Sequence, residues 1–470
     1  MPRLVDTDKF DVTELERPGE SWSVTIVGLG LPSLQTAQVL LVEASPRFDL
    51  LLRQTLFATQ AREIPAGQPR DVPPPSPKLC LLFIDNAEAS SKLDLAVCRQ
   101  VLGSASRNGV LSLEENMFDT TTDSNVRFLT RQDLQSAGAE LTIAEIHAAT
   151  DAAWAAIKSG RAFGGKAVLS LPEEEFWQRE SVAPFRRDFV DERLGWKLSA
   201  LYCVNPTHGG VKIIGANAFN RHLGLPRSTS TVVLLEKRTL RPLAILDGTA
   251  ISALRTGTYA SKVVDLFVRS QAPVSGFIFG SGPVARSVVE CLNFACPDLI
   301  GDIFIRSRSI EGVERLLSDF DDRTSFRLHA VTDNQRLKEC ALLITATNAR
   351  QPLFEDEELH RGAVTLHLGG DEVPETYLQR ALKCGTVVCD DIETVSRRNS
   401  QSIALHFSRQ ALSLEEIGPL LGVRELSAPN DWVREADTPV CVTCVGLPML
   451  DLYAVQATYE KYLARTQESA

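Results

Sequence analysis

The sequence predicts an α/β protein with a parallel sheet, a mixed sheet and an extra N-terminal α/β region. Three observations support this fold class. First, residues 274–306 read as a strand, a glycine turn, a helix and a second strand. Second, the apolar segments ALLITAT, AVTLHLGG and TVVCDD continue this pattern of buried strands. Third, short strands of alternating polarity precede residue 274. The chain has 470 residues, so about two or three domains are expected.

The first region covers residues 1–122 and is broken by a proline-rich run at 73–77, which should be extended and act as a spacer. Before this run, WSVTIVGLGLPSLQTAQVLL reads as a strand, a glycine turn at Gly28 and Gly30, and a helix. The prolines stand where a second strand–helix unit should follow. We therefore interpret this stretch as a structural turn and assign no role to the N-terminal extension.

A second region begins at residue 123 and continues to 265. A helix is expected over about 143–157, because apolar residues recur there at spacings of three and four and Gly160 follows. Alternating strands at about 198–204, 211–215 and 231–235 predict a mixed sheet. His147 in the helix is interpreted as an incidental residue rather than a ligand.

The third region, residues 266–395, opens with VSGFIFGSGPVARSVVECLNFACPDLIGDIFIR. Gly280 allows a tight turn after the strand, Gly282 lets the backbone approach a pyrophosphate, and Ala285 stands where a third glycine would pack helix on strand. The phosphates would lie at the positive end of the helix that starts near Pro283. This pattern predicts a Rossmann-like dinucleotide-binding domain. Its phosphate-binding residues are expected to be Gly280, Ser281, Gly282, Pro283, Val284 and Ala285.

The end of the second strand predicts which dinucleotide is bound. An NAD-binding domain normally has Asp or Glu there, whose carboxylate binds the ribose 2′-hydroxyl. This chain instead reads IRSRS, with Arg306, Ser307 and Arg308, and guanidinium groups bind phosphate by paired hydrogen bonds. We therefore predict NADP(H), with NAD(H) as the alternative. Thr345 and Thr347, at the end of ALLITAT, are expected to complete the cofactor site.

Composition excludes several classes of partner. A net charge of −11 leaves no basic surplus for nucleic acid or an anionic membrane. No run of about 18 uncharged apolar residues could span a bilayer, and the N-terminus has no apolar signal core, so a cytoplasmic protein is expected. Cys441 and Cys444 form a CxxC in a predicted strand without a second such pair, and no metal site is expected.

The segment GGVKIIGANAFNRHLGLPRSTSTVVLLEKRTLRPLAILDGTAISALRTGTYAS, followed by the glycine turn and LHLGGD, resembles the ornithine cyclodeaminase and μ-crystallin family. The resemblance covers about residues 127–465. GLPRSTS and DGTAISALRT look closest to the N-(2-amino-2-carboxyethyl)-L-glutamate dehydrogenase branch, which serves diaminopropionate synthesis for siderophores. The resemblance implies a substrate-binding and dimerisation domain, built from 123–265 and 396–470, and a homodimer.

The resemblance also implies site residues. Lys212 in GVKIIGA matches a lysine that lies beside the substrate. Arg255 in ALRTGT matches an arginine near the substrate carboxylate and the nicotinamide. Asp371 in LGGDEVPE matches an aspartate that handles the substrate amine. The carboxylate-binding arginine is expected to be Arg186 or Arg187. Independently, removal of hydride from the α-carbon of an amino acid needs a group that accepts the ammonium proton, and a partly buried carboxylate suits this role.

One departure concerns the helix that presents Arg255. RTGT replaces the RTAA that is commoner in the family, so Gly257 is expected to loosen this helix.

The implied function is an NADP(H)-dependent oxidoreductase acting on the C–N bond of a small amino or imino acid. The reaction is either reduction of a ketimine or oxidative cleavage of an N-carboxyalkyl amino acid. Two alternatives stay open: redox-neutral ornithine cyclodeamination, and NADPH-dependent binding of a small molecule as in μ-crystallin. The joint presence of Lys212, Arg255 and Asp371 favours an enzyme.

Overall fold

The computed structural model describes residues 125–268, 272–320, 323–428 and 437–467, together with four strands among the first 124 residues. The chain divides into two compact units, Met1–Thr120 and Thr121–Ala470, close to the expected boundary at 122. The proline-rich run at 73–77 lies outside the described residues.

The first unit contains a sheet of order β1-β2-β4-β3. Its strands are β1 (Lys9–Phe10), β2 (Val24–Val27), β3 (Ala37–Glu43) and β4 (Lys78–Ile84). The helix expected after Gly30 is wrong over 37–43, which forms β3. This segment includes the β-branched Val39 and Val42 and pairs in parallel with β4 over its whole length, so ladder hydrogen bonds replace helical ones.

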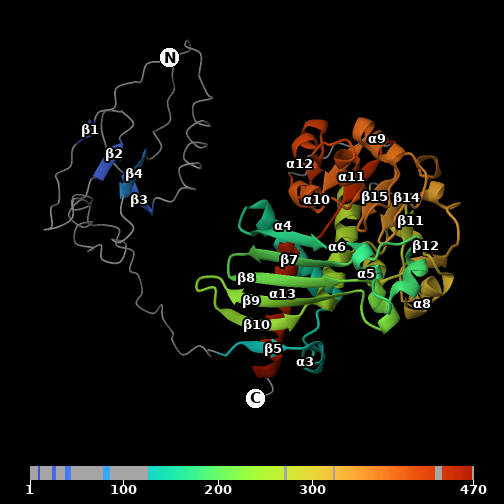
Figure 1. Ribbon diagram of the computed structural model, residues 1–470, viewed down its shortest axis with the longest axis horizontal. Coiled ribbons are helices and arrows are strands. Elements are labelled where there is room, and N and C mark those ends of the chain that lie inside the picture. Colours follow the sequence, from blue (N-terminus) through green and yellow to red (C-terminus); the bar gives the residue numbers. More distant parts are fainter. Residues whose placement is uncertain are drawn as a thin grey trace, which may run out of the picture. The chain divides into compact units, whose positions relative to one another are not determined.

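The second unit begins with a six-stranded sheet of order β5-β10-β9-β8-β7-β6. The strands are β5 (Arg127–Leu129), β6 (Phe163–Ser170), β7 (Lys197–Val204), β8 (His208–Ala216), β9 (Ser228–Glu236) and β10 (Pro242–Asp247). Only β5 and β10 pair in parallel, so the predicted mixed sheet is confirmed. The C-terminal helix α13 (Pro448–Gln467) runs across one face of this sheet (Figure 1).

The predicted helix over 143–157 is α4 (Ile143–Lys158). It begins with a capping box, in which Thr142 and Glu145 bond each other's backbone N–H groups. The short helices α3 (Arg131–Ser136) and α5 (Glu173–Trp177) and the 3-10 helix η1 (Ala183–Phe189) connect the strands around it.

The Rossmann-like domain contains an eight-stranded, all-parallel sheet of order β13-β12-β11-β14-β15-β18-β16-β17. The strands are β11 (Val274–Phe279), β12 (Ile300–Arg306), β13 (Arg327–Ala330), β14 (Cys340–Thr345), β15 (Val364–His367), β16 (Thr386–Cys389), β17 (Arg424–Glu425) and β18 (Val440–Thr443). The sheet extends past the boundary expected at 395, because β17 and β18 return to its far edge. The segment 396–470 is thus shared between the two sheets: β17 and β18 join the parallel sheet, and α13 packs on the mixed one.

Both faces of the parallel sheet are covered. Ile278 of β11 joins one apolar cluster, whereas Phe277 and Phe279 on either side of it join another. The helices around the sheet are α6 (Thr249–Phe267), α7 (Pro283–Ala295), α8 (Ile310–Phe320), α9 (Glu375–Cys384), α10 (Ile392–Arg398), α11 (Ser402–Ser408) and α12 (Leu414–Ile417). The first cluster also includes Leu234 of the mixed sheet and Leu450 of α13, so one core joins the two sheets.

Gly257 does not loosen α6, which runs unbroken from Thr249 to Phe267. A Cβ atom at Gly257 would overlap the backbone carbonyl of Ser287 and lie 2.9 Å from Cys291 Sγ, both on α7. The glycine is needed because the two helices pack closely at this point.

We expect Gly257→Ala to lower the free energy of unfolding by about 1–3 kcal/mol, as overpacking does in other cores. Urea denaturation would measure the change. Gly215→Ala is the matched control, because nothing lies within 4 Å of a Cβ atom built there. Equal stability of both variants and the parent would contradict the packing role.

Candidate active site

The glycine turn after β11 opens a cavity of 620 Å³ at the carboxyl ends of β12, β11 and β14. Gly280 has φ +118°, and a Cβ atom there would lie 2.6 Å from the carbonyl oxygen of Ala346. Gly282 is the N-cap of α7, which has no side-chain cap, and no atom lies within 4 Å of a Cβ built there. The first N–H groups of α7 are thus open to a phosphate, so these residues fit the dinucleotide.

Most of the predicted cofactor residues line this cavity. They are Gly280, Ser281, Gly282, Arg306, Ser307, Arg308 and Thr347. Pro283 is the first residue of α7, Val284 faces a neighbouring cavity, and Ala285 is fully buried at the contact of helix and sheet. Thr345 lies behind the wall, because its fully buried hydroxyl bonds Glu372 and His367.

The two arginines after β12 already have protein partners. Arg306 Nη1 donates to Asn334 Oδ1 at 2.5 Å, and its guanidinium lies 5.9 Å from the ring centre of Phe279. Arg308 Nη1 lies 3.0 Å from Glu192 Oε1. The IRSRS pattern did not indicate Arg315, which lines the same cavity from α8.

A second cavity, of 280 Å³, adjoins the first, since residues 346–349 line both. Four cationic side chains line it: Arg193, Lys197, Arg227 and Arg398. They come from the segments before β7 and β9, from β7 itself and from the end of α10. Burial, followed by repulsion from the three arginines, lowers the pKa of Lys197 to about 7. Burial and the neighbouring arginines, despite the attraction of Asp390, lower the pKa of Arg398 to about 10.

Asp371 lies beside this second cavity, after the Gly369-Gly370 turn that lines it. Its Oδ2 accepts a hydrogen bond from Arg409 and lies 3.7 Å from Arg193 Nη2. Arg193 packs closely on this turn, since a Cβ atom at Gly370 would lie 2.8 Å from Arg193 Nη1. Asp371 therefore follows two residues that line the cavity but is not itself among the lining residues, and its role toward the substrate stays a prediction.

Glu372, which the sequence did not single out, organises the loop between the cavities. Its carboxyl is fully buried and accepts hydrogen bonds from Thr345 Oγ1 at 2.8 Å, from Thr347 N at 2.7 Å and from Thr347 Oγ1. Burial raises its pKa, although these bonds oppose the rise. Thr345 and Thr347 therefore position the loop 346–349 through Glu372.

Lys212 and Arg255 meet on a single carboxylate, that of Asp451 in α13. Lys212 Nζ and Arg255 Nε each lie 2.8 Å from Asp451 Oδ1, and all three residues are buried. Burial lowers the pKa of Lys212 to about 8 despite this partner. Burial raises the pKa of Asp451, but the two cations outweigh it and the net shift is downward. Neither Lys212 nor Arg255 is among the residues that line these two cavities.

Arg186 and Arg187 are not in the cavity. Both lie on η1 with exposed side chains; Arg186 pairs with Glu174, and Arg187 Nε lies 3.9 Å from Asp188 Oδ1. Phe189 of η1 packs into an aromatic cluster with Trp177, which turns the arginines outward. Arg193, a few residues after Arg187 in the chain, does line the smaller cavity.

Lys166 on β6 is a further, half-buried cation near the site. Its Nζ donates to the carbonyl oxygen of Val445 at 2.5 Å. Burial, and then repulsion from Arg398 and Arg255, hold its pKa well below the usual range. FGGKAVLS contains no motif that would have separated this lysine from a surface residue.

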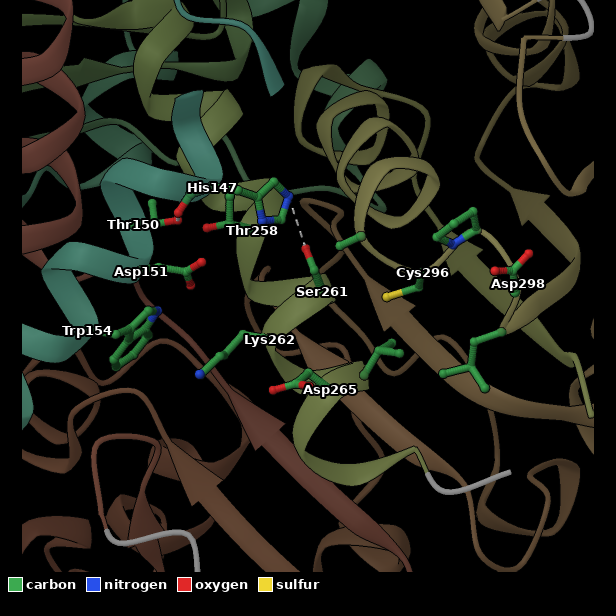
Figure 2. A pocket seen from close by; sticks show the side chains of 14 residues that line it. His147, Thr150, Asp151, Trp154, Thr258, Ser261, Lys262, Asp265, Cys296 and Asp298 are labelled. Carbon is green, nitrogen blue, oxygen red and sulfur yellow. Dashed lines mark hydrogen bonds between the residues drawn. The ribbon is translucent and has the colours of Figure 1, made fainter. Parts of the chain in front are cut away.

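A third cavity, of 510 Å³, lies between α4, α6 and the end of α7 (Figure 2). His147 points into it, with Nε2 3.4 Å from Ser261 Oγ and its ring 5.0 Å from that of Phe294. Burial lowers the pKa of His147. The charged residues that line this third cavity include both acids and a base, namely Asp151, Lys262, Asp265 and Asp298. None of the predicted site residues lines this cavity.

Within the described ranges, no group of three His, Cys, Asp or Glu residues could hold a metal ion.

Residues 197–465 match the model of the Ornithine cyclodeaminase/mu-crystallin family. Alanine dehydrogenase of Archaeoglobus fulgidus is 25% identical over 260 residues, which cover 55% of this chain and 78% of that protein. Delta(1)-pyrroline-2-carboxylate reductase of Bacillus cereus is 23% identical over 312 residues, which cover 64% of this chain and 92% of that protein.

Two solved structures share the fold. A Delta(1)-pyrroline-2-carboxylate reductase of Thermococcus litoralis, in complex with NADH and L-proline, has a TM-score of 0.60 and 17% identity, covering 73% of this chain and 98% of that one. An archaeal alanine dehydrogenase dimer with bound NAD has a TM-score of 0.58 and 21% identity, covering 73% of this chain and 97% of that one. The α/β architecture with its Rossmann-like domain is therefore that of these proteins.

Proposed function

Because this chain belongs to the ornithine cyclodeaminase/mu-crystallin family, we propose that it is an NADP(H)-dependent oxidoreductase acting on the C–N bond of an amino or imino acid. The observation that carries the proposal is the junction of two cavities at residues 346–349. The larger cavity has the glycine turn and open helix end that suit a dinucleotide, and the smaller one has cations that suit a carboxylate.

The chain's own residues then have distinct tasks. When bound, the nicotinamide supplies or accepts the hydride. Arg193 and the neighbouring cations bind the substrate carboxylate. Asp371 accepts the proton of the substrate nitrogen during oxidation and returns it during reduction. Lys212 and Arg255, which line neither of these cavities, hold α13 in place through Asp451.

Two reactions fit this arrangement: reduction of a ketimine, and oxidative cleavage of an N-carboxyalkyl amino acid. Membership of the N-(2-amino-2-carboxyethyl)-L-glutamate dehydrogenase branch, with a role in siderophore synthesis, stays a prediction from GLPRSTS and DGTAISALRT. The cytoplasmic location is part of the same proposal. No helix in the described part of the chain is long and apolar enough to cross a membrane.

The function is tested by incubating the full-length protein with NADP+ or NADPH and a panel of ketimines, ornithine and N-carboxyalkyl amino acids. Products are identified by mass spectrometry. We expect oxidation or reduction at one C–N bond with a matching change in NADPH absorbance. Conversion of ornithine to proline without net consumption of cofactor would contradict the proposal and support cyclodeamination.

The choice of cofactor is tested at the end of β12. Arg306→Ala/Arg308→Ala is expected to weaken NADPH binding about 10- to 100-fold and NADH binding little, because a charged hydrogen bond contributes about 1.5–3 kcal/mol. Fluorescence titration with both cofactors measures this. Arg336→Ala, which removes an exposed arginine paired with Glu339, is the control. Tighter binding of NADH than of NADPH by the parent protein would refute the assignment.

The open face of the mixed sheet supports the proposed homodimer. Its strands present exposed apolar side chains on the side away from α13: Phe128, Phe163, Leu169, Leu198, Tyr202 and Ile213. Leu169 is paired with Leu198 in the sheet, and the ring of Tyr202 lies over its partner Gly165, where a Cβ atom would be 2.6 Å from the tyrosine hydroxyl. A continuous apolar face of this kind suits an interface between two copies.

Tyr202→Asp/Ile213→Asp is expected to convert the dimer to a monomer, because two carboxylates from each copy would have to be buried at the interface. Sedimentation velocity at several concentrations measures the mass. Leu420→Asp changes another exposed leucine, on the 3-10 turn at Pro419–Leu421, and should leave the mass unchanged. An unchanged dimer in the double variant would place the interface elsewhere.

A further inference from the structure

The smaller cavity contains more positive charge than one substrate carboxylate needs. Arg193, Lys197, Arg227 and Arg398 line it, and Lys166 is close enough to Arg398 to be repelled by it. Among the described residues that line it, the one acid is Glu173. This carboxylate is already used, because it pairs with Arg350 and accepts a hydrogen bond from the backbone N–H of Leu194 at 2.9 Å.

The carboxylates just outside the cavity are also committed to other groups. Asp371 pairs with Arg409 as well as approaching Arg193. Glu192 pairs with Arg221 and Arg308. Asp390 Oδ2 accepts hydrogen bonds from Tyr259 and from the backbone N–H groups of Val445 and Gly446. These carboxylates still attract the cluster, since Asp390 acts on Arg398 and Lys166 and Glu192 acts on Arg227. The surplus of positive charge that remains is at Lys197, which is surrounded by arginines alone.

Lys197 shows this surplus most clearly. Its ammonium has neither a hydrogen bond nor an ion pair with any described residue, and the charges nearest to it are Arg398, Arg227 and Arg193. The other cations have only neutral or shared contacts. Arg227 donates to Asn348 Oδ1 at 2.7 Å, and Arg193 donates to the carbonyl oxygen of Ser400 at 3.0 Å. Each can therefore still bind an anion.

We infer that the substrate of this site carries at least two carboxylates, of which Lys197 and Arg227 bind the second. The inference rests on the proposed function, in which this cavity holds the substrate. Arg193, next to Asp371, is placed to bind the carboxylate at the reacting carbon. A second carboxylate would pair with the half-buried ammonium of Lys197, which has no other partner among the described residues, and with the exposed guanidinium of Arg227 beside it.

This charge pattern separates the alternative substrates. Ornithine has a second ammonium group, which the cluster would repel, and a neutral aromatic molecule would leave the cations uncompensated. Alanine and proline, with one carboxylate each, would satisfy Arg193 only. The class that fits is an amino or imino acid with two or three carboxylates, including N-carboxyalkyl derivatives of acidic amino acids.

The test compares substrates with one, two and three carboxylates on the full-length protein with NADP+. L-Alanine, L-proline and L-ornithine have one, L-glutamate has two, and N-(1-carboxyethyl)-L-glutamate has three. In parallel, calorimetry measures the affinity of propionate and tricarballylate for the enzyme saturated with NADP+. We expect kcat/KM to be at least 100-fold higher with two or three carboxylates, and tricarballylate to bind at least 100-fold more tightly than propionate.

Lys197→Met and Arg227→Met should each weaken tricarballylate binding about 10- to 100-fold, and change propionate binding less than about threefold. Lys338→Met and Arg238→Met, on the exposed surface away from the cavity, are the matched controls and should bind as the parent does. Thermal unfolding shows that each variant is folded. Because anion binding needs a charged ammonium, parent affinity should also fall as pH rises above about 7, and Lys197→Met should remove this dependence.

The possible results separate the two proposals. Equal turnover of alanine or proline and of the acidic substrates, unaffected by Lys197→Met, overturns the inference and leaves the oxidoreductase function standing. Tricarballylate binding that depends on Lys197 and Arg227, with no turnover of any substrate, supports the anion site and contradicts the oxidoreductase function. Loss of tricarballylate binding in the surface controls also contradicts the inference.

Discussion

Asp371→Asn is expected to reduce turnover at least about 100-fold, and up to about 10,000-fold, while cofactor affinity changes little. Asp371 lies at the edge of the basic cavity, where Arg193 and Arg409 contact the same carboxylate oxygen. Asparagine has nearly the same shape, but its amide does not accept a proton at neutral pH. The expected loss is therefore in kcat, since the cavity formed by 280–282 and 346–349 is unchanged.

Single-turnover kinetics and NADPH titration separate these two effects. Asp356→Asn is the matched control, because Asp356 also pairs with an arginine, Arg380, but outside both cavities. The control should keep near-parent activity. Near-parent activity of Asp371→Asn would show that another group handles the proton.

Asp451→Asn is expected to lower the free energy of unfolding by about 3–5 kcal/mol, because it leaves Lys212 and Arg255 buried without a counter-charge. Urea denaturation measures the change, and the same variant should lose activity at temperatures where it remains folded. Asp319→Asn breaks the exposed pair with Arg286 and should change stability by less than about 1 kcal/mol.

A second variant distinguishes charge from packing. If the uncompensated cations cause the loss, then Lys212→Met in the Asp451→Asn background should recover part of the stability. Two results together would show that the triad does not hold α13 in place. Asp451→Asn alone would lower the free energy of unfolding by less than about 1 kcal/mol, and the added Lys212→Met would recover none of this free energy.

Local patterns predicted the parts of the fold that depend on nearby residues. The turn at Gly280 and Gly282, the helix after it and the strand ending at Arg306 all follow from glycine geometry and apolar spacing within a short segment. The mixed sheet was predicted for the same reason, since side-chain alternation shows in each strand separately. The helix assigned to 37–43 was wrong, because pairing with the distant β4 outweighs the local pattern.

The sequence by itself determined the family, the α/β fold, the dinucleotide loop and the place of Asp371 after a glycine pair. Only the tertiary structure decided which charges meet. It joined Lys212 and Arg255 to Asp451, about 200 residues or more away in the chain, and it placed Arg193 in the lining of the smaller cavity and Arg186 and Arg187 outside it. It also gathered the cavity cations, Arg193, Lys197, Arg227 and Arg398. The physical reason is that burial and charge act through space, and no spacing along the chain shows which lysine or arginine will be desolvated beside another.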